Sequence, residues 1–221
     1  MEKSDIAVWS CARTGSQRCK RKMVRPFGGT SLTDICLEKL SKLDMNTFFA
    51  GYEPLFKEKC DAHGVSFVQR TEKSSLTEKS PLEIWDFLAD QPYEYFLQVN
   101  GCQPFLTVET ISKFIEACIE DDRPKFGVIK NKNYFTDTDG NPYNFSKDLK
   151  LMNTKNVDPV YEFSHSLYFF KKSYFLENGR YWDWNDVRYI EINEGVETFD
   201  IDTEDDFIMA EAMWKGGLNL K

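Results

Sequence analysis

Residues 6–25, IAVWSCARTGSQRCKRKMVR, join a short apolar run to a turn-forming, strongly basic loop. The apolar run 6–9 predicts a buried strand, and Gly15-Ser16 predicts a turn after it. Six cations follow in the loop, and no acidic residue lies between Asp5 and Asp34. The cations are Arg13, Arg18, Lys20, Arg21, Lys22 and Arg25. A cationic loop after a first strand favours binding of a polyphosphate, because backbone amides and cationic side chains can both contact its oxygens.

The chain as a whole is acidic, with 221 residues and a formal net charge of −8. This charge argues against general affinity for nucleic acid, so the basic loop indicates a small anionic ligand. The length suits one α/β domain with a small elaboration. No apolar run approaches the roughly 20 residues of a membrane-spanning helix. Residues 1–5 lead into the first strand without an apolar signal segment, so a cytoplasmic location is expected.

The cysteines and histidines give little support for a zinc site. The chain has six cysteines without a Cys-x-x-Cys pair, and its two histidines are His63 and His165. We expect most of the thiols to be buried and reduced, because free cysteine behaves as a small hydrophobic residue.

Strand-like and helix-like segments alternate through the first 130 residues. Short apolar runs predict strands over 6–9, 47–50, 66–69, 95–99 and 126–130. Helical spacing and capping residues predict helices over 31–43, 54–63, 80–88 and 108–120. The third of these helices starts at Ser80 as the N-cap, with proline and glutamate in the expected first-turn positions. The alternation predicts an α/β fold with a mostly parallel sheet covered by helices.

Residues 131–164 interrupt this alternation with a turn cluster at 137–142 and no helical period. This segment predicts a projecting, β-rich excursion that could serve as a dimerisation element. The sheet is expected to resume with strands over 166–170 and 187–192 and helices over 173–178 and 203–215. Residues 1–130 and 165–221 would then form one nucleotide-binding domain. The aromatic cluster 181–184 is interpreted as core or interface, because each aromatic ring buries a large area.

Asp200 and Asp202 form a second candidate site, a pair of carboxylates near the end of the chain. In an extended segment their side chains point to the same side, about 7 Å apart. Two such carboxylates can share Mg²⁺, which usually retains waters and binds substrate phosphates as well. Glu204 and Asp205 are interpreted as residues of a helix N-terminus, because acids there interact favourably with the helix dipole.

Several segments match one family in order over nearly the whole chain. They are Ala12–Ser16 with Lys22, Gly64–Arg70, Leu97-Gln98, Pro104–Leu106, Tyr161-Glu162, Ser166–Phe170 and Asp200–Thr203. The set resembles the cytidylyltransferases that make CMP-activated acidic sugars, namely the CMP-N-acylneuraminate and CMP-Kdo synthetases. The resemblance implies a Rossmann-like fold, CTP and a small acidic acceptor as substrates, and a homodimer joined through the excursion.

The same resemblance implies roles for the residues of the nucleotide site. Arg13 and Lys22 would hold the triphosphate, and Ser16 would lie in the nucleotide-binding loop. The backbone around Ala12 would contact the cytidine together with two side chains, those of Arg70 and Ser80.

The acceptor and metal residues follow from the resemblance as well. Gln98 would contact the acceptor sugar, and Asp200 and Asp202 would bind Mg²⁺. Arg13, Lys22 and Asp202 would then be the catalytic residues for attack of an acceptor oxygen on the α-phosphate, with release of pyrophosphate.

The chain also departs from the family pattern. Met23 replaces an asparagine at the end of the basic loop, and residues 99–103 form a longer turn than in the sialic-type enzymes. Ser164-His165 replaces Asn-Gly, and residues 153–159 replace an arginine-rich segment. The resemblance therefore supports CTP as a substrate more strongly than it supports sialic acid as the acceptor. Lys155 and His165 are candidates to replace the missing contacts to an anion.

Three alternatives stay open at this stage. The chain could be a cytidylyltransferase for a different carboxylated or phosphorylated acceptor. It could be a metal-dependent glycosyltransferase that binds a nucleotide sugar through Asp200-x-Asp202. It could also be a non-catalytic nucleotide-binding module. The residue pattern identifies neither the acceptor nor a general base.

Overall fold

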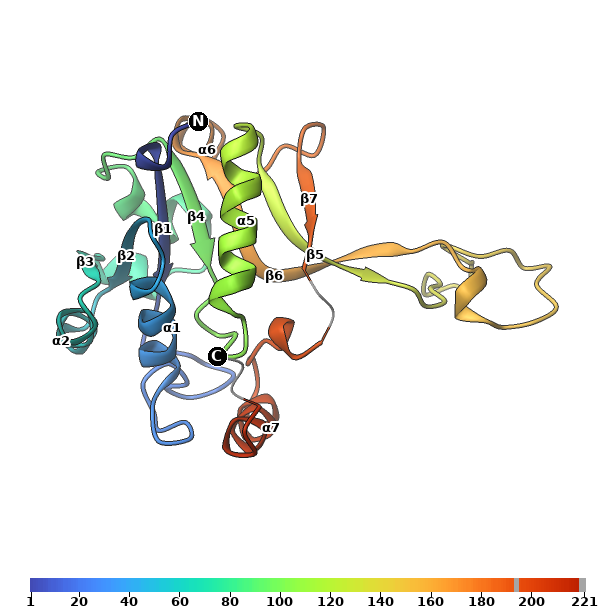
Figure 1. The fold of residues 1–221 in the computed structure, drawn as a ribbon, viewed down its shortest axis with the longest axis horizontal. Coiled ribbons are helices and arrows are strands. Elements are labelled where there is room, and N and C mark those ends of the chain that lie inside the picture. Colours follow the sequence, from blue (N-terminus) through green and yellow to red (C-terminus); the bar gives the residue numbers. More distant parts are fainter. Residues whose placement is uncertain (193–194, 219–221) are drawn as a thin grey trace.

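The sheet of this protein has seven strands in the order β3-β2-β1-β4-β6-β5-β7 (Figure 1). The structure, a computed structural model, describes residues 1–192 and 195–218. All strand pairs are parallel except those of β6, which runs antiparallel to both β4 and β5. The strands are β1 Ile6–Cys11, β2 Asn46–Gly51, β3 Ser66–Gln69, β4 Tyr95–Val99, β5 Lys125–Asn131, β6 Val160–Lys171 and β7 Arg188–Glu191. The mostly parallel α/β sheet predicted from the sequence is confirmed.

Helices cover the sheet, and most of them agree with the sequence pattern. They are α1 Leu32–Ser41, α2 Pro54–His63, α3 Glu72–Leu76, α4 Pro81–Ile84, α5 Val108–Glu120, α6 Lys172–Asn178 and α7 Glu204–Lys215. Short 3₁₀ turns lie at Lys3–Asp5, Asp86–Leu88, Thr154–Asn156 and Val196–Thr198. Gly64 ends α2 in the left-handed conformation, and Thr203 caps α7. None of the helices in the described part of the chain is long and apolar enough to span a membrane.

The region between β3 and β4 differs from the expected single helix over 80–88. Ser80 does cap α4, but this helix ends at Ile84, and a 3₁₀ turn over Asp86–Leu88 follows. Trp85 leaves the helical region because its ring packs edge-on against Trp9 in the core. The short helix α3 was not predicted, since its residues show no apolar periodicity.

Strand β1 is buried on both faces, as is typical of a covered parallel sheet. Ile6 and Val8 belong to the larger hydrophobic cluster, which also includes buried residues of α1 and α5. Ala7 and Trp9 point to the opposite face, where Trp9 stacks on Phe48. Packing on both faces holds the end of β1, and therefore the start of the basic loop, in one place.

Strand β6 is much longer than the 166–170 expected from the sequence. It begins at Val160, and it contains a bulge opposite β5, because Phe126 pairs with Tyr168 while Val128 pairs with Phe163. The residues between β5 and β6 project far from the sheet (Figure 1). The extended part of β6 was missed because its burial is mixed, without a continuous apolar run.

Candidate functional site

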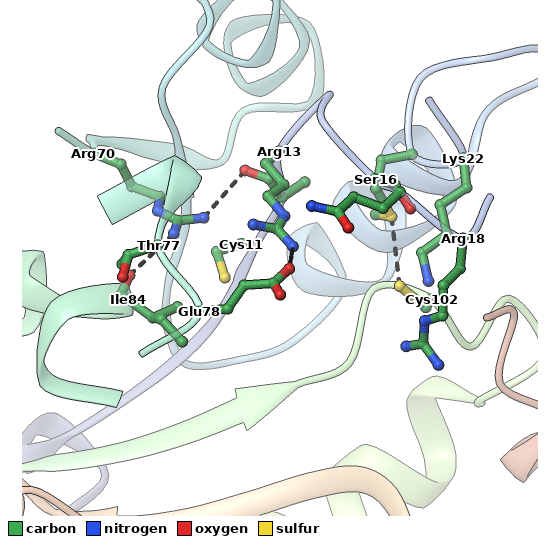
Figure 2. A pocket seen from close by; sticks show the side chains of 13 residues that line it. Cys11, Arg13, Ser16, Arg18, Lys22, Arg70, Thr77, Glu78, Ile84 and Cys102 are labelled. Carbon is green, nitrogen blue, oxygen red and sulfur yellow. Dashed lines mark hydrogen bonds and ion pairs between the residues drawn. The ribbon is translucent and has the colours of Figure 1, made fainter. Parts of the chain in front are cut away.

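A pocket of about 570 Å³ lies at the carboxyl end of β1 (Figure 2). It is lined by Cys11, Ala12, Arg13, Ser16, Gln17, Arg18, Lys22, Met23, Arg70, Thr77, Glu78, Ile84 and Cys102. The end of β1 with the basic loop, the segment from Arg70 to α4, and the turn after β4 contribute these residues. They meet because the parallel strands β1, β3 and β4 end at the same edge of the sheet.

The predicted nucleotide residues Ala12, Arg13, Ser16, Lys22 and Arg70 all line this pocket. The other predicted site residues lie outside its lining. The Ser80 hydroxyl accepts a hydrogen bond from the Glu83 amide as the cap of α4. Gln98 lies on β4, in register with Tyr168 of β6. Lys155 belongs to the projecting segment, so within one chain it does not reach the pocket.

Met23 fixes the far end of the basic loop. It is buried, and its carbonyl accepts hydrogen bonds from the amide and the hydroxyl of Thr33 at the start of α1. Its sulfur lies 3.7 Å from Cys102 Sγ, on the turn after β4. The methionine at this position therefore anchors the loop to the core by packing. Burial raises the pKa of Cys102 to about 12, so its thiol is neutral at physiological pH.

Arg13, Arg18, Lys22 and Arg25 of the loop are paired with carboxylates from distant segments. Arg13 contacts Glu78, and its Nη1 also donates to the Ser75 carbonyl at 3.3 Å. Arg18 Nη2 donates to Asp202 Oδ1 at 2.8 Å, and Lys22 Nζ lies 3.3 Å from the same oxygen. These pairs bring the predicted phosphate-binding and metal-binding residues together.

Two further contacts fasten the loop to the start of α7. Lys22 donates to the Ile201 carbonyl, and Arg25 makes a two-pronged contact with Glu204 at 2.7 and 3.0 Å. Glu204 thus pairs with a loop cation in addition to lying in the first turn of α7. The reciprocal cap of this helix is made by Asp206 with Thr203.

Asp200 lies next to this cluster, in the irregular segment between the last 3₁₀ turn and α7. Its Oδ2 accepts from Asn100 Nδ2 at 3.2 Å, while Oδ1 is buried without a hydrogen-bond partner in the described structure. Burial raises the pKa of Asp200, and the neighbouring charge of Asp202 raises it further. An unpartnered buried carboxylate oxygen beside a second carboxylate fits a bound divalent cation, which would neutralise both charges.

No group of three or more His, Cys, Asp or Glu side chains converges on a metal-sized site within residues 1–192 and 195–218. A divalent cation at Asp200 and Asp202 would therefore need further oxygens from substrate phosphates or water. Mg²⁺ commonly binds in this way.

Arg70 has a bracing position in the pocket wall. Its residue surface is only 4% exposed, and its guanidinium donates to the carbonyls of Ala12, Ser74 and Ile84. The Ser74 hydroxyl accepts a further bond from Nε. These bonds connect the basic loop, α3 and α4, so Arg70 determines the shape of this side of the pocket.

The structure adds residues that the sequence reasoning did not assign. Glu78 and Thr77 line the pocket from an irregular segment that has no motif. Asn100 connects Asp200 to the bulge of β6, because its Nδ2 also donates to the His165 carbonyl at 3.1 Å. Asn100 could have been found as a polar residue directly after a parallel strand, where ligands of such sheets bind. His165 has a positive φ of 54°, and its Nδ1 contacts the Tyr168 hydroxyl.

Known proteins resemble this chain in sequence and in fold. The sequence model of a family described as Cytidylyltransferase matches residues 11–206. No curated protein matches the chain. A CMP:2-keto-3-deoxy-manno-octonic acid synthetase complexed with CTP is similar in structure, with a TM-score of 0.68 at 11% identity, covering 97% of this chain and 100% of that one.

Two other solved structures share the fold. A 4-diphosphocytidyl-2C-methyl-D-erythritol synthase from Anaerococcus prevotii has a TM-score of 0.65 at 17% identity, covering 97% of this chain and 100% of that one. A cytidylyltransferase from Leptospira borgpetersenii has a TM-score of 0.59 at 14% identity, covering 95% of this chain and 87% of that one. At these identities the likeness shows the Rossmann-like α/β fold.

Proposed function

Because this chain belongs to the cytidylyltransferase family, we propose that it transfers CMP from CTP to a 2-keto sugar acid and releases pyrophosphate. The observation that carries the proposal is the pairing of cations in the pocket lining with a carboxylate just before α7. Arg13, Arg18 and Lys22 line the pocket from the loop after β1. Asp202 lies outside the lining but pairs with Arg18 and Lys22, and Asp200 stands two residues before it. This arrangement suits a triphosphate with a divalent cation.

The loop cations would act on the phosphates. The acceptor oxygen attacks the α-phosphorus in line, and the bond to pyrophosphate breaks as the new oxygen–phosphorus bond forms. The hydroxyl proton passes to water. Arg13 and Lys22 would stabilise the charge that develops on the leaving pyrophosphate. Lys22 is well placed for this role, since its side chain is only 12% exposed and its charge is little screened by water.

Asp200 and Asp202 would hold Mg²⁺. When bound, the ion would polarise the α-phosphate and lower the pKa of a bound hydroxyl. Asn100 would keep Asp200 in position through its hydrogen bond, and Lys22 would hold the segment through the Ile201 carbonyl.

The name of one structural neighbour, a CMP:2-keto-3-deoxy-manno-octonic acid synthetase, supports an acidic sugar as the acceptor. We place the acceptor beside Asp200, where Asn100, His165 and Gln98 supply polar groups. Gln98 Oε1 is buried without a hydrogen-bond partner among the described residues, and the proposal assigns it a sugar hydroxyl as its donor. The methylerythritol-type neighbour supports a second candidate, transfer to a different acceptor by the same chemistry.

CTP together with Mg²⁺ is expected to raise the melting temperature by roughly 5–11 °C. A ligand at a hundredfold excess over its Kd stabilises the folded state by about 2.7 kcal/mol, which corresponds to such a shift for a chain of this size. The measurement is a thermal-shift comparison of CTP, UTP, ATP and GTP, each with and without Mg²⁺. A higher melting temperature with UTP alone would instead favour a glycosyltransferase function. An unchanged melting temperature with every nucleotide would contradict the proposal.

The projecting residues 132–159 are proposed to join two copies into a homodimer. Three large apolar side chains of this segment are mostly exposed to solvent, namely Tyr143 (79%), Leu151 (68%) and Met152 (74%). Several exposed apolar side chains on one segment are typical of an interaction surface. We expect a dimer in sedimentation analysis at micromolar concentration, and a monomer when Leu151 and Met152 are both replaced by glutamate. A strict monomer of the unaltered chain would remove this proposal.

A further inference from the structure

The carboxylate of Glu78 lies inside the pocket and pairs with Arg13, the residue proposed to hold the triphosphate (Figure 2). The two residues are far apart in the chain, since Arg13 follows β1 and Glu78 lies between α3 and α4. A carboxylate and a phosphate oxygen seek the same donors of a guanidinium. Glu78 therefore engages a guanidinium donor that a phosphate oxygen would also seek.

The surroundings of Glu78 do not depend on this contact. Thr77 is held by its own hydrogen bond to Glu83 Oε2 at 3.0 Å, and Ser80 caps α4. Arg13 keeps a second hydrogen bond, to the Ser75 carbonyl. The Glu78 side chain is 61% exposed and that of Arg13 30%, so the pair can open into water at small cost.

We propose that Glu78 is an internal competitor of the polyphosphate and determines which ligands the pocket prefers. The inference rests on the proposed function, in which Arg13 contacts CTP phosphates. A ligand whose phosphates reach Arg13 must displace Glu78 and tolerate its negative charge nearby. A ligand without phosphates, such as cytidine, leaves the pair intact.

The test compares the wild-type protein with Glu78→Gln, which keeps the size of the side chain and removes its charge. Isothermal titration calorimetry would measure binding of inorganic tripolyphosphate, CTP and cytidine. We expect tripolyphosphate and CTP to bind about fivefold more tightly to the variant, the size expected from loss of one solvent-accessible ion pair. Cytidine should bind equally to both proteins.

The matched control is Glu72→Gln, which removes the same charge from an exposed position at the start of α3, outside the pocket lining. This control should bind tripolyphosphate as the wild-type protein does. In a background carrying Arg13→Gln, the gain from Glu78→Gln should disappear, because the competition requires the guanidinium. A melting curve of each variant would show that the fold is retained.

Equal binding of tripolyphosphate to the wild-type protein and Glu78→Gln would overturn the inference. So would a gain that persists without Arg13, since it would reflect general repulsion of a polyanion. Weaker cytidine binding by Glu78→Gln would also overturn it, by assigning the carboxylate to the nucleoside. Tripolyphosphate could bind more tightly to Glu78→Gln than to the wild-type protein, while CTP binds no more tightly than tripolyphosphate. In that case the competitor role of Glu78 holds and the proposed cytidylyl transfer fails.

Discussion

Replacing Asp202 by asparagine is expected to lower the rate of pyrophosphate release from CTP by about a hundred- to a thousandfold, the range for loss of one preorganised charge at a transition state. The carboxylate is proposed to hold Mg²⁺ beside the α-phosphate, and an amide is a much weaker ligand for this cation. The measurement is pyrophosphate release with a panel of acidic sugars as acceptors.

Binding of CTP should survive this change. Asp202 pairs with Arg18 and Lys22, so Asp202→Asn leaves both cations available to phosphates. Asp205→Asn is the matched control, because this exposed acid lies nearby in the first turn of α7 but has no ion pair with the loop cations among the described residues. Near-normal turnover of Asp202→Asn, or equal losses in both variants, would contradict the metal assignment.

Arg70→Met is expected to lower the free energy of unfolding by about 3–5 kcal/mol, because three carbonyls lose a donor at roughly 1–3 kcal/mol for each one left unsatisfied. Methionine fills much of the volume but donates no hydrogen bond. The carbonyls of Ala12, Ser74 and Ile84 would each lose a donor in the largely buried surroundings of Arg70. Urea unfolding followed by circular dichroism would measure the loss.

A suitable control is Arg123→Met, since Arg123 is exposed and its ion pair is with Asp121 at the surface. Exposed pairs of this kind contribute about 0.2–1 kcal/mol. A loss below about 1 kcal/mol for Arg70→Met, similar to that of the control, would show that the guanidinium does not brace the pocket wall.

Much of the fold could be predicted because its information is local. Helices α2 and α5 begin and end where capping residues and apolar spacing placed them, and strands β3 and β4 match their apolar runs. The start of β6 could not be predicted in this way, because residues 160–165 gain their strand structure from pairing with β5 across a bulge. The break at Trp85 also depends on a distant partner, the ring of Trp9.

The candidate site also has features that depend on local sequence and features that depend on tertiary contacts. The sequence by itself determined that a cationic loop follows β1, that Asp200 and Asp202 precede α7, and that the elements between them form a mostly parallel sheet. Residue type and periodicity carry this information, since they depend on neighbours within a few positions. Only the tertiary structure decided that Asp202 contacts Arg18 and Lys22, that Arg70 is a buried brace, and that Glu78 enters the pocket. These contacts join residues about 60 to 180 positions apart, and they exist only because the parallel strands bring their carboxyl ends to one edge of the sheet.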